Sequence, residues 1–315
     1  MVISRDSKKI ESYKSNRLKN YMRKHWILYA MLVLPVAYFF IFSYVPLVNV
    51  LLAFKQNNVV ARVWDVPWVG FDNFVHIFSL QIFRDAIRNT LMFSFLDLVI
   101  GFPAPIILAL LLNELKLPRF KKITQTISYM PFFLSWVIVG GLSVSLFSTS
   151  TGTINAIIIN MGFDPIPFLN NPRYWVFTNV LLSVWRSVGW NTIIYLAAIT
   201  NVNPELYEAA DMDGASRIRK MWHVTLPSIR PVIIILLILT LGQIMGADLA
   251  RFISLENLIV RSVSEVLPTF VFRWGLQSMQ FSIAAAVGIF QSLIGMVLLL
   301  SANFAVKKLG GQGFW

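Results

Sequence analysis

Carboxylates and small apolar residues alternate in residues 201–230, a polar stretch between two long apolar runs. Glu205 and Glu208 offer negative charge to basic groups of a partner, and Ala209 and Ala210 leave a narrow apolar surface on another face of the same helix. This combination suits recognition more than bond-making, because a short helix of this kind fits into the cleft of a second protein. The alternative is a solvated hairpin of the kind that any polytopic protein carries.

Local signals predict two short helices in this stretch. Asn203 offers a side-chain oxygen as a helix cap, and Pro204 fixes φ at the first helical position. Gly214 marks a turn that needs positive φ. Residues 216–223 are predicted to form a second helix, which ends before Pro227.

No residue set in the chain is suited to catalysis or to metal binding. Cysteine is absent, and the three histidines (His25, His76 and His223) are scattered. A phosphate-binding loop requires a Gly-Lys pair, and none occurs. We therefore expect the chain not to be an enzyme and to bind no cofactor or metal itself, so that any ATP hydrolysis would take place on a separate subunit.

Composition indicates a chain that lies mostly in lipid. Of the 315 residues, 57% are hydrophobic and 13% are charged, and the mean hydropathy is +0.66. Six apolar stretches have the length of about 20 residues that crosses a bilayer. They are residues 26–53, 89–112, 123–147, 174–200, 231–250 and 281–306. We therefore predict an all-α polytopic membrane domain over 26–315, preceded by a basic tail at 1–25.

Basic residues predict the orientation of these spans. The segments assigned to the inside carry 18 Lys and Arg residues, and those assigned to the outside carry eight. Both termini and the 201–230 stretch are then cytoplasmic, and segments 54–88, 148–173 and 251–280 form external caps. The net charge of +12 is concentrated in the tail, which indicates contact with anionic lipid headgroups and argues against a nucleic-acid partner.

The external segments are long and rich in aromatic residues. Trp64, Trp68, Phe71, Phe74 and Phe168 occur there with few charges. We expect a folded cap on which a solute-binding protein could dock, and membrane-hugging loops are the alternative.

Arg186 lies near the middle of the predicted fourth span, where a charge is costly and faces the protein interior or water. Two interpretations remain open. Arg186 either lines a transport path and attracts a carboxylated or hydroxyl-rich ligand, or it forms a structural ion pair with Asp97, which with Asp248 makes up the acidic residues of the predicted spans.

Other polar and aromatic residues in the spans could contact a sugar. Trp185 and Trp190 offer faces for sugar rings, and Asn191 and Gln243 could hydrogen-bond hydroxyl groups. Tryptophan at the end of a span is more often an interfacial anchor, and we assign that role to Trp175.

Helix-breaking residues suggest joints within two spans. Pro103 and Pro105 fall in the second predicted span, and Gly140 and Gly141 fall in the third. They could give the bundle bendable joints, although single kinks are ordinary in membrane helices.

The order of residues in the polar stretch resembles a known signature. It consists of Glu208-Ala209-Ala210, three residues, Gly214, nine residues, and then Val224-Thr225-Leu226-Pro227. This pattern is similar to the cytoplasmic loop of permease subunits from bacterial binding-protein-dependent ABC importers. Val224 stands where Ile is frequent, and Trp222 stands where Phe is common. The resemblance implies an ATPase-coupling loop formed by Glu205, Glu208, Ala209, Ala210, Asp213, Gly214, Leu226 and Pro227.

Softer likenesses extend over most of the chain. Residues 184–199, Pro35, residues 44–46, 284–291 and 310–315 are similar to those of carbohydrate-type, maltose-permease-like subunits. The subgroup implied imports oligosaccharides and polysaccharide fragments, alginate among them.

The resemblance implies the fold of a type I ABC importer permease in the bacterial cytoplasmic membrane, working by alternating access. Its expected partners are two ATPase subunits that bind ATP and Mg, a second and distinct permease, and an extracytoplasmic solute-binding protein that delivers the oligosaccharide. Three alternatives remain: a permease for a non-carbohydrate solute, an ion-coupled secondary transporter, and a non-transporting membrane scaffold. A secondary transporter predicts inverted repeats, and none is evident in the sequence.

Overall fold

The computed structural model describes residues 21, 23–59 and 63–308. Nearly all elements of this part are helices, and an isolated antiparallel bridge joins Lys55 to Trp68. The predicted basic tail lies mostly outside the described residues, as does the terminal stretch 310–315. The all-α prediction is confirmed.

Among the described residues, four continuous helices are long and apolar enough to cross a membrane, and a bent pair makes a fifth if it is one span. The four are Trp26–Phe54, Gln81–Asn113, Arg217–Gly242 and Phe281–Lys308. The predicted fourth span corresponds to α9 (Pro172–Thr200), which has 29 residues but is not among these apolar helices. Its polar residues, Arg186 among them, explain the difference.

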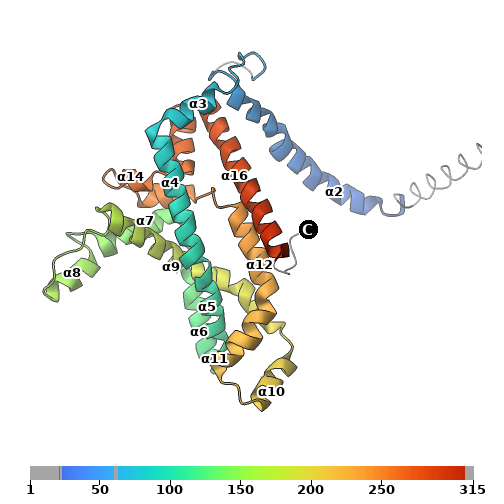
Figure 1. The fold of residues 1–315 in the computed structure, drawn as a ribbon, viewed down its shortest axis with the longest axis vertical. Helices are drawn as coiled ribbons and strands as arrows, with labels where there is room; N and C mark the ends of the chain where they lie inside the picture. The colour runs from blue at the N-terminus through green and yellow to red at the C-terminus, as the bar shows by residue number, and fades with distance from the viewer. Residues whose placement is uncertain (1–20, 22, 60–62, 309–315) are drawn as a thin grey trace, which may run out of the picture.

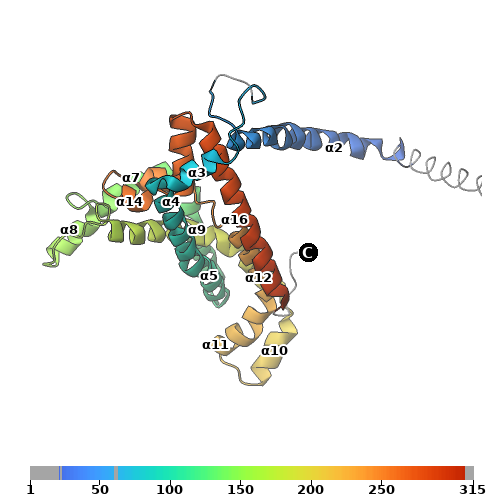
Figure 2. The ribbon, with the colours of Figure 1, turned by 45° about the horizontal axis from the view of Figure 1, so that its top comes forward.

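The N-terminal part of the first span stands apart from the rest of the described chain, and its C-terminal end packs against α16 (Figures 1 and 2). It consists of α2 (Trp26–Phe39), a π-helical turn (Phe40–Tyr44) and a 3-10 segment (Val45–Phe54). In this stretch Ala53 is the buried residue, and α2 buries none. An apolar helix exposed on all sides within one chain needs lipid or another protein around it.

The second span remains helical through its prolines. Short α3 (Asp72–Ser79) leads into α4 (Gln81–Leu96), a π turn (Asp97–Gly101) and α5 (Pro103–Asn113). The Phe102 amide donates to the Asp97 carbonyl at 2.8 Å, so the wider turn ends just where Pro103 lacks a donor. The prediction that Pro103 and Pro105 interrupt this helix is therefore wrong.

The third span is broken, but not at its glycines. Helix α6 (Pro118–Tyr129) and a 3-10 turn (Met130–Phe133) meet α7 (Trp136–Phe147) at 104°. Leu134 and Ser135 are extended, and the Ser135 hydroxyl caps α7 by accepting from the Ile138 amide. The predicted joint at 140–141 is wrong, since both glycines lie within α7.

Helix α8 (Thr153–Asn160) precedes the long α9, which Asn171 caps. Trp175 in α9 is 1% exposed, and its Nε1 donates to the Leu255 carbonyl at 2.8 Å. Its ring packs edge-on to Phe93. The prediction of an interfacial anchor is wrong, because tertiary packing buries this ring in the core.

The 201–230 stretch forms a hairpin at the end of the molecule opposite α3 (Figures 1 and 2). It contains α10 (Pro204–Met212), α11 (Arg217–Lys220) and a π turn (Met221–Thr225) that continues into α12 (Leu226–Gly242). The predicted helix end before Pro227 is wrong. The Leu226 amide bonds the Met221 carbonyl across the π turn, and Pro227 then sits in the first turn of α12, where a missing donor has no cost.

The predicted fifth span also ends too late, because α12 stops at Gly242 and not at residue 250. Asp248 consequently lies outside that helix and caps the next one. Four short elements and the last span follow: α13 (Leu249–Leu255), α14 (Arg261–Ser264), α15 (Leu267–Phe270), a π segment (Val271–Gln277) and α16 (Phe281–Lys308).

Candidate functional site

The 201–230 hairpin is built by the local signals that its sequence carries. The Asn203 side chain accepts from the Glu205 amide at 3.1 Å, and Pro204 opens α10. Gly214 has a φ of +69°, and the Ala215 amide bonds back to the Ala210 carbonyl at 2.9 Å. These contacts close the first helix and turn the chain toward α11.

The hairpin presents carboxylates and apolar side chains to solvent. Glu205, Glu208 and Ala209 are exposed, and Ala210 is half-buried. The exposed large apolar side chains of the hairpin are Leu206, Met212, Ile218 and Trp222. A surface that mixes apolar groups with carboxylates is suited to protein docking. Asp213 is exposed at the end of α10, whereas Leu226 and Pro227 lie where the hairpin joins the span.

Two side-chain contacts brace α10 against the helix that follows. Lys220 Nζ lies 2.7 Å from Asp211 Oδ1, and Tyr207 Oη lies 2.9 Å from the buried Thr225 Oγ1. Sequence analysis named Thr225 within the loop signature but did not predict its contact with Tyr207, because the two side chains are 18 residues apart. The brace ties the exposed helix to the π turn at the base of α12.

A polar cavity lies farther along the bundle, between the second span, α9, α12 and α13. It has two adjoining parts of about 320 Å³ and about 240 Å³, which share Asp97 and Thr240 in their walls. Polar groups of the first part come from Ser183, Ser187 and Asn191. The second part is lined by Ser94, Gln243, Asp248 and Arg251, among others. These polar side chains are thus satisfied or solvated inside the bundle and do not face lipid.

Of the predicted path residues, Asn191 and Gln243 line this cavity. Both are exposed in the described chain. Trp190 does not line it but stacks on Phe132, with ring centroids 4.6 Å apart and an angle of 3° between the planes. Trp185 is 41% exposed and also lies outside the walls.

Arg186 makes contacts that neither prediction anticipated. Its Nε donates to the Leu134 carbonyl at 3.0 Å, and its guanidinium lies over the rings of Trp136 and Phe132, at 4.8 and 5.3 Å from their centroids. The predicted ion pair with Asp97 is wrong. Arg186 instead satisfies a carbonyl that the bend in the third span leaves free.

The partner of Asp97 is Arg251, which the sequence had placed in an external cap. Arg251 Nη1 lies 2.7 Å from Asp97 Oδ2, and Arg251 is only 4% exposed. Its Nε donates to Asn179 Oδ1 at 2.8 Å, and its guanidinium lies over the neighbouring rings of Phe93 and Phe252, at 5.7 and 5.3 Å from their centroids. The signal in the sequence was Asp248, a helix cap three residues earlier that indicates a short helix here.

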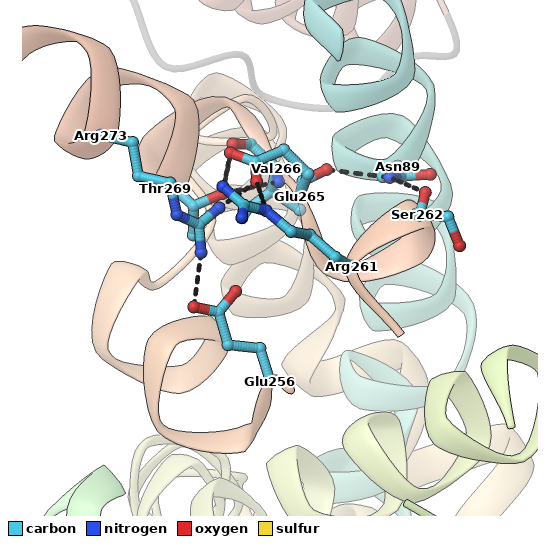
Figure 3. Close-up of polar contacts among 8 residues, drawn as sticks. All are labelled: Asn89, Glu256, Arg261, Ser262, Glu265, Val266, Thr269 and Arg273. Carbon is cyan, nitrogen blue, oxygen red and sulfur yellow. Dashed lines mark hydrogen bonds and ion pairs between the residues drawn. The ribbon is translucent and has the colours of Figure 1, made fainter. Parts of the chain in front are cut away.

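A second ion-pair network holds the segment between α13 and the last span (Figure 3). Arg273 bridges two carboxylates, because it bonds Glu256 Oε1 at 2.5 Å and also bonds Glu265 Oε2. Arg261 Nε lies 3.6 Å from Glu265 Oε2, and Thr269 Oγ1 donates to Glu265 Oε1 at 3.1 Å. We call these five residues the Arg273 network.

The Arg273 network is anchored to the second span. Asn89 Nδ2 donates to the carbonyls of Ser262 and Glu265, at 2.9 Å each (Figure 3). Burial raises the pKa of the Glu265 carboxyl, and the nearby Arg273 opposes that shift. Because Glu256 ends α13, the network fixes the helix that carries Arg251 into the cavity.

The fold defines a class: a multi-pass helical membrane protein with an exposed hairpin at one end and a cavity with polar groups in its walls. Residues 73–310 match the family described as binding-protein-dependent transport system inner membrane component. The chain belongs to this family and is a multi-pass inner-membrane protein.

Two characterised permeases from Bacillus subtilis (strain 168) are similar over almost the whole chain. The polygalacturonan/rhamnogalacturonan transport system permease protein YteP is 43% identical, covering 91% of this chain and 90% of that protein. The arabinooligosaccharides transport system permease protein AraP is 31% identical, covering 87% and 85%.

A solved structure shares the fold. It is a bacterial alginate ABC transporter in complex with an alginate pentasaccharide-bound periplasmic protein, and its matching chain is 38% identical with a TM-score of 0.87. The match covers 94% of this chain and 99% of that one. The predicted permease fold is thereby confirmed.

Proposed function

We propose that this chain is the permease subunit of an ATP-driven importer of oligosaccharides or polysaccharide fragments. The observation that carries the proposal is that one chain contains both an exposed hairpin, braced at one end of the molecule, and a cavity with polar walls in the bundle. The similarity to permeases named for polygalacturonan and arabinooligosaccharide transport supports a sugar as the solute.

In this proposal the hairpin is the docking element for an ATPase. Leu206 and Met212 supply apolar contact area, and Glu205 and Glu208 pair with basic groups on the rim of the ATPase cleft. Movement of the docked α10 passes through the Tyr207–Thr225 contact into α12, which lines the cavity. ATP and Mg remain on two copies of the partner subunit, and the permease itself hydrolyses nothing.

The cavity is the candidate path, and a second permease completes it. Asn191, Gln243 and Thr240 offer side-chain donors and acceptors to sugar hydroxyls. Opening would alternate between the two sides of the membrane as the ATPase dimer closes and separates. A solute-binding protein outside the membrane delivers the oligosaccharide, and the known complex of the alginate transporter with such a protein supports this arrangement.

Uptake into proteoliposomes tests the proposal. The complex is purified from its native membrane by a tag on this chain, reconstituted, and supplied with the solute-binding protein and labelled oligosaccharide. We expect accumulation that requires hydrolysable ATP and that ionophores leave unchanged. Uptake driven by an ion gradient without ATP would show a secondary transporter instead, and binding of partners without any flux would show a scaffold.

A further inference from the structure

Arg251 is a buried cation at the wall of the polar cavity, and its environment holds it rigidly. Asn179 Oδ1 accepts from Nε, and the guanidinium packs over the adjoining rings of Phe93 and Phe252. A group fixed in this way keeps its direction when its counter-ion changes. Both Arg251 and its ion-pair partner Asp97 line the second part of the cavity.

The ion pair with Asp97 uses one of the two terminal nitrogens of the Arg251 guanidinium. Asp97 contacts it through one oxygen on Nη1, and Nη2 has no hydrogen-bond partner within the described residues. A carboxylate that spans Nη1 and Nη2 would make the two parallel bonds that are the strongest arrangement for this pair. The resting contact is therefore weaker than a bidentate one.

Asp97 is also free to leave. Its side chain is 38% exposed, against 5% for Arg251, and it lines both parts of the cavity. The nearby Asp248 cannot take its place, because Asp248 accepts from Trp136 Nε1 and from the amides at the start of α13. Asp97 can thus turn toward water while Arg251 stays in place.

We propose that Arg251 binds a carboxylate of the substrate, and that Asp97 is the counter-ion of Arg251 when no substrate is present. The substrate class is then an acidic oligosaccharide that contains uronic acid residues, which enters the path by displacing Asp97 from the guanidinium. This inference rests on the proposed function and adds the chemical class of the sugar. Similarity to a permease named for polygalacturonan and to the importer of "the acidic polysaccharide alginate" agrees with it.

The test compares two matched trisaccharides. One is a galacturonate trisaccharide, and the other is the same sugar with its carboxyl groups reduced to alcohols. Their dissociation constants are measured on the purified complex in lipid nanodiscs without the solute-binding protein, so that only the transport path selects. We expect the unmodified complex to bind the acidic sugar about tenfold or more tightly than the neutral one.

Variants of Arg251 and Asp97 distinguish recognition of the substrate carboxylate from a purely structural ion pair. Arg251→Gln should remove the preference for the acidic sugar, so that the dissociation constants of the two sugars lie within about twofold of each other. Asp97→Asn should tighten the acidic sugar severalfold, because no counter-ion then competes for Arg251, and should leave the neutral sugar unchanged. Asp85→Asn, which removes the carboxylate of an exposed pair with Arg88 on the same helix, is the matched control and should change neither.

The outcomes that overturn the inference are distinct from those that overturn the function. Equal binding of both sugars by the unmodified complex, or weaker binding of the acidic sugar by Asp97→Asn, overturns the role of Arg251 and leaves the importer intact. Failure of the unmodified complex to bind either sugar or to take up any oligosaccharide overturns the proposed function as well. Should Arg251→Gln fail to assemble, Asp97→Asn still decides the question.

Discussion

Gly214 is required by the backbone of the hairpin, because its φ of +69° lies in the left-handed region. A Cβ at this position would meet nothing within 4 Å, so the constraint is conformational and not steric crowding. Gly214→Val should cost about 1–2 kcal/mol at the turn and misdirect α10. We expect ATP-driven uptake to fall severalfold or more, with unchanged insertion into the membrane.

The control for this prediction is Gly214→Asn, since asparagine tolerates the left-handed region. It should retain most of the uptake. Normal uptake by the valine variant would contradict the docking role of the hairpin.

Arg273 neutralises two carboxylates at once, and Glu265 is the more buried of them, at 3% side-chain exposure. Arg273→Gln leaves Glu265 with the longer contact to the more exposed Arg261 as its ion pair, which should cost up to about 3 kcal/mol and lower the melting temperature of the complex. Removing the cation raises the pKa of Glu265 beyond the rise that burial already causes.

The pH dependence of this variant has a definite sign. A carboxyl whose folded pKa is raised binds more protons when folded, so its contribution to stability is full below the ordinary value of 4.5 and is lost as pH rises through the folded pKa. Arg273→Gln should therefore melt closer to the unmodified protein at pH 5 than at pH 8. Arg88→Gln, which removes an exposed cation, should melt like the unmodified protein at both values.

Local and distant contacts differ in how far sequence predicts them. The Asn203 cap and the Gly214 turn were predicted because each depends on neighbours within a few residues. Arg251 and Asp97 are 154 residues apart, and no spacing rule links them. Arg186 was predicted to line the path or to pair with Asp97, because a charge in the middle of a span is costly. Its bond to the Leu134 carbonyl could not be predicted, because a bend that the sequence did not reveal leaves that carbonyl free.

Substitutions of the two adjacent glycines of α7 can show whether they serve close helix packing or helix flexibility. A Cβ on Gly140 would lie 2.4 Å from the Ser254 carbonyl oxygen of α13, whereas a Cβ on Gly141 would meet nothing within 4 Å. Gly140→Ala should force α7 and α13 apart and destabilise the protein by about 1–3 kcal/mol, measured as a lower melting temperature.

Gly141→Ala is the matched control, because alanine in an open helical position stabilises by about 0.5–1 kcal/mol. Loss of stability in both variants would restore the interpretation of this pair as a flexible joint. Loss in the first alone would show that Gly140 serves the close approach of α13, the helix that carries Arg251.

Helix boundaries were the least predictable part of the fold. Pro227 signalled a helix end, but a π turn shifted the hydrogen bonds by one residue and carried the helix through. The same device carries the second span past Pro103. The length of the apolar stretches predicted where the helices lie. The helix ends depend on backbone hydrogen bonds, which hydropathy does not predict.

Across the whole molecule, the hairpin and α3 mark opposite ends, and the Arg273 network lies in the segment between α13 and the last span (Figures 1 and 3). The cavity lies between the helices that connect these ends. Helix α2 buries no residue against the rest of the described chain. One chain therefore leaves an apolar span uncovered, which favours a second permease or lipid around it.

Purification of the tagged chain from its native membrane in mild detergent tests this assembly. We expect an ATPase subunit and a second permease to be recovered in fixed ratio by mass spectrometry. In Glu208→Lys, the ATPase should be lost and the second permease retained, because Glu208 is exposed on α10 of the hairpin. Loss of both partners would show that Glu208 supports the fold, and recovery of the unmodified chain alone, where other complexes survive, would contradict the importer.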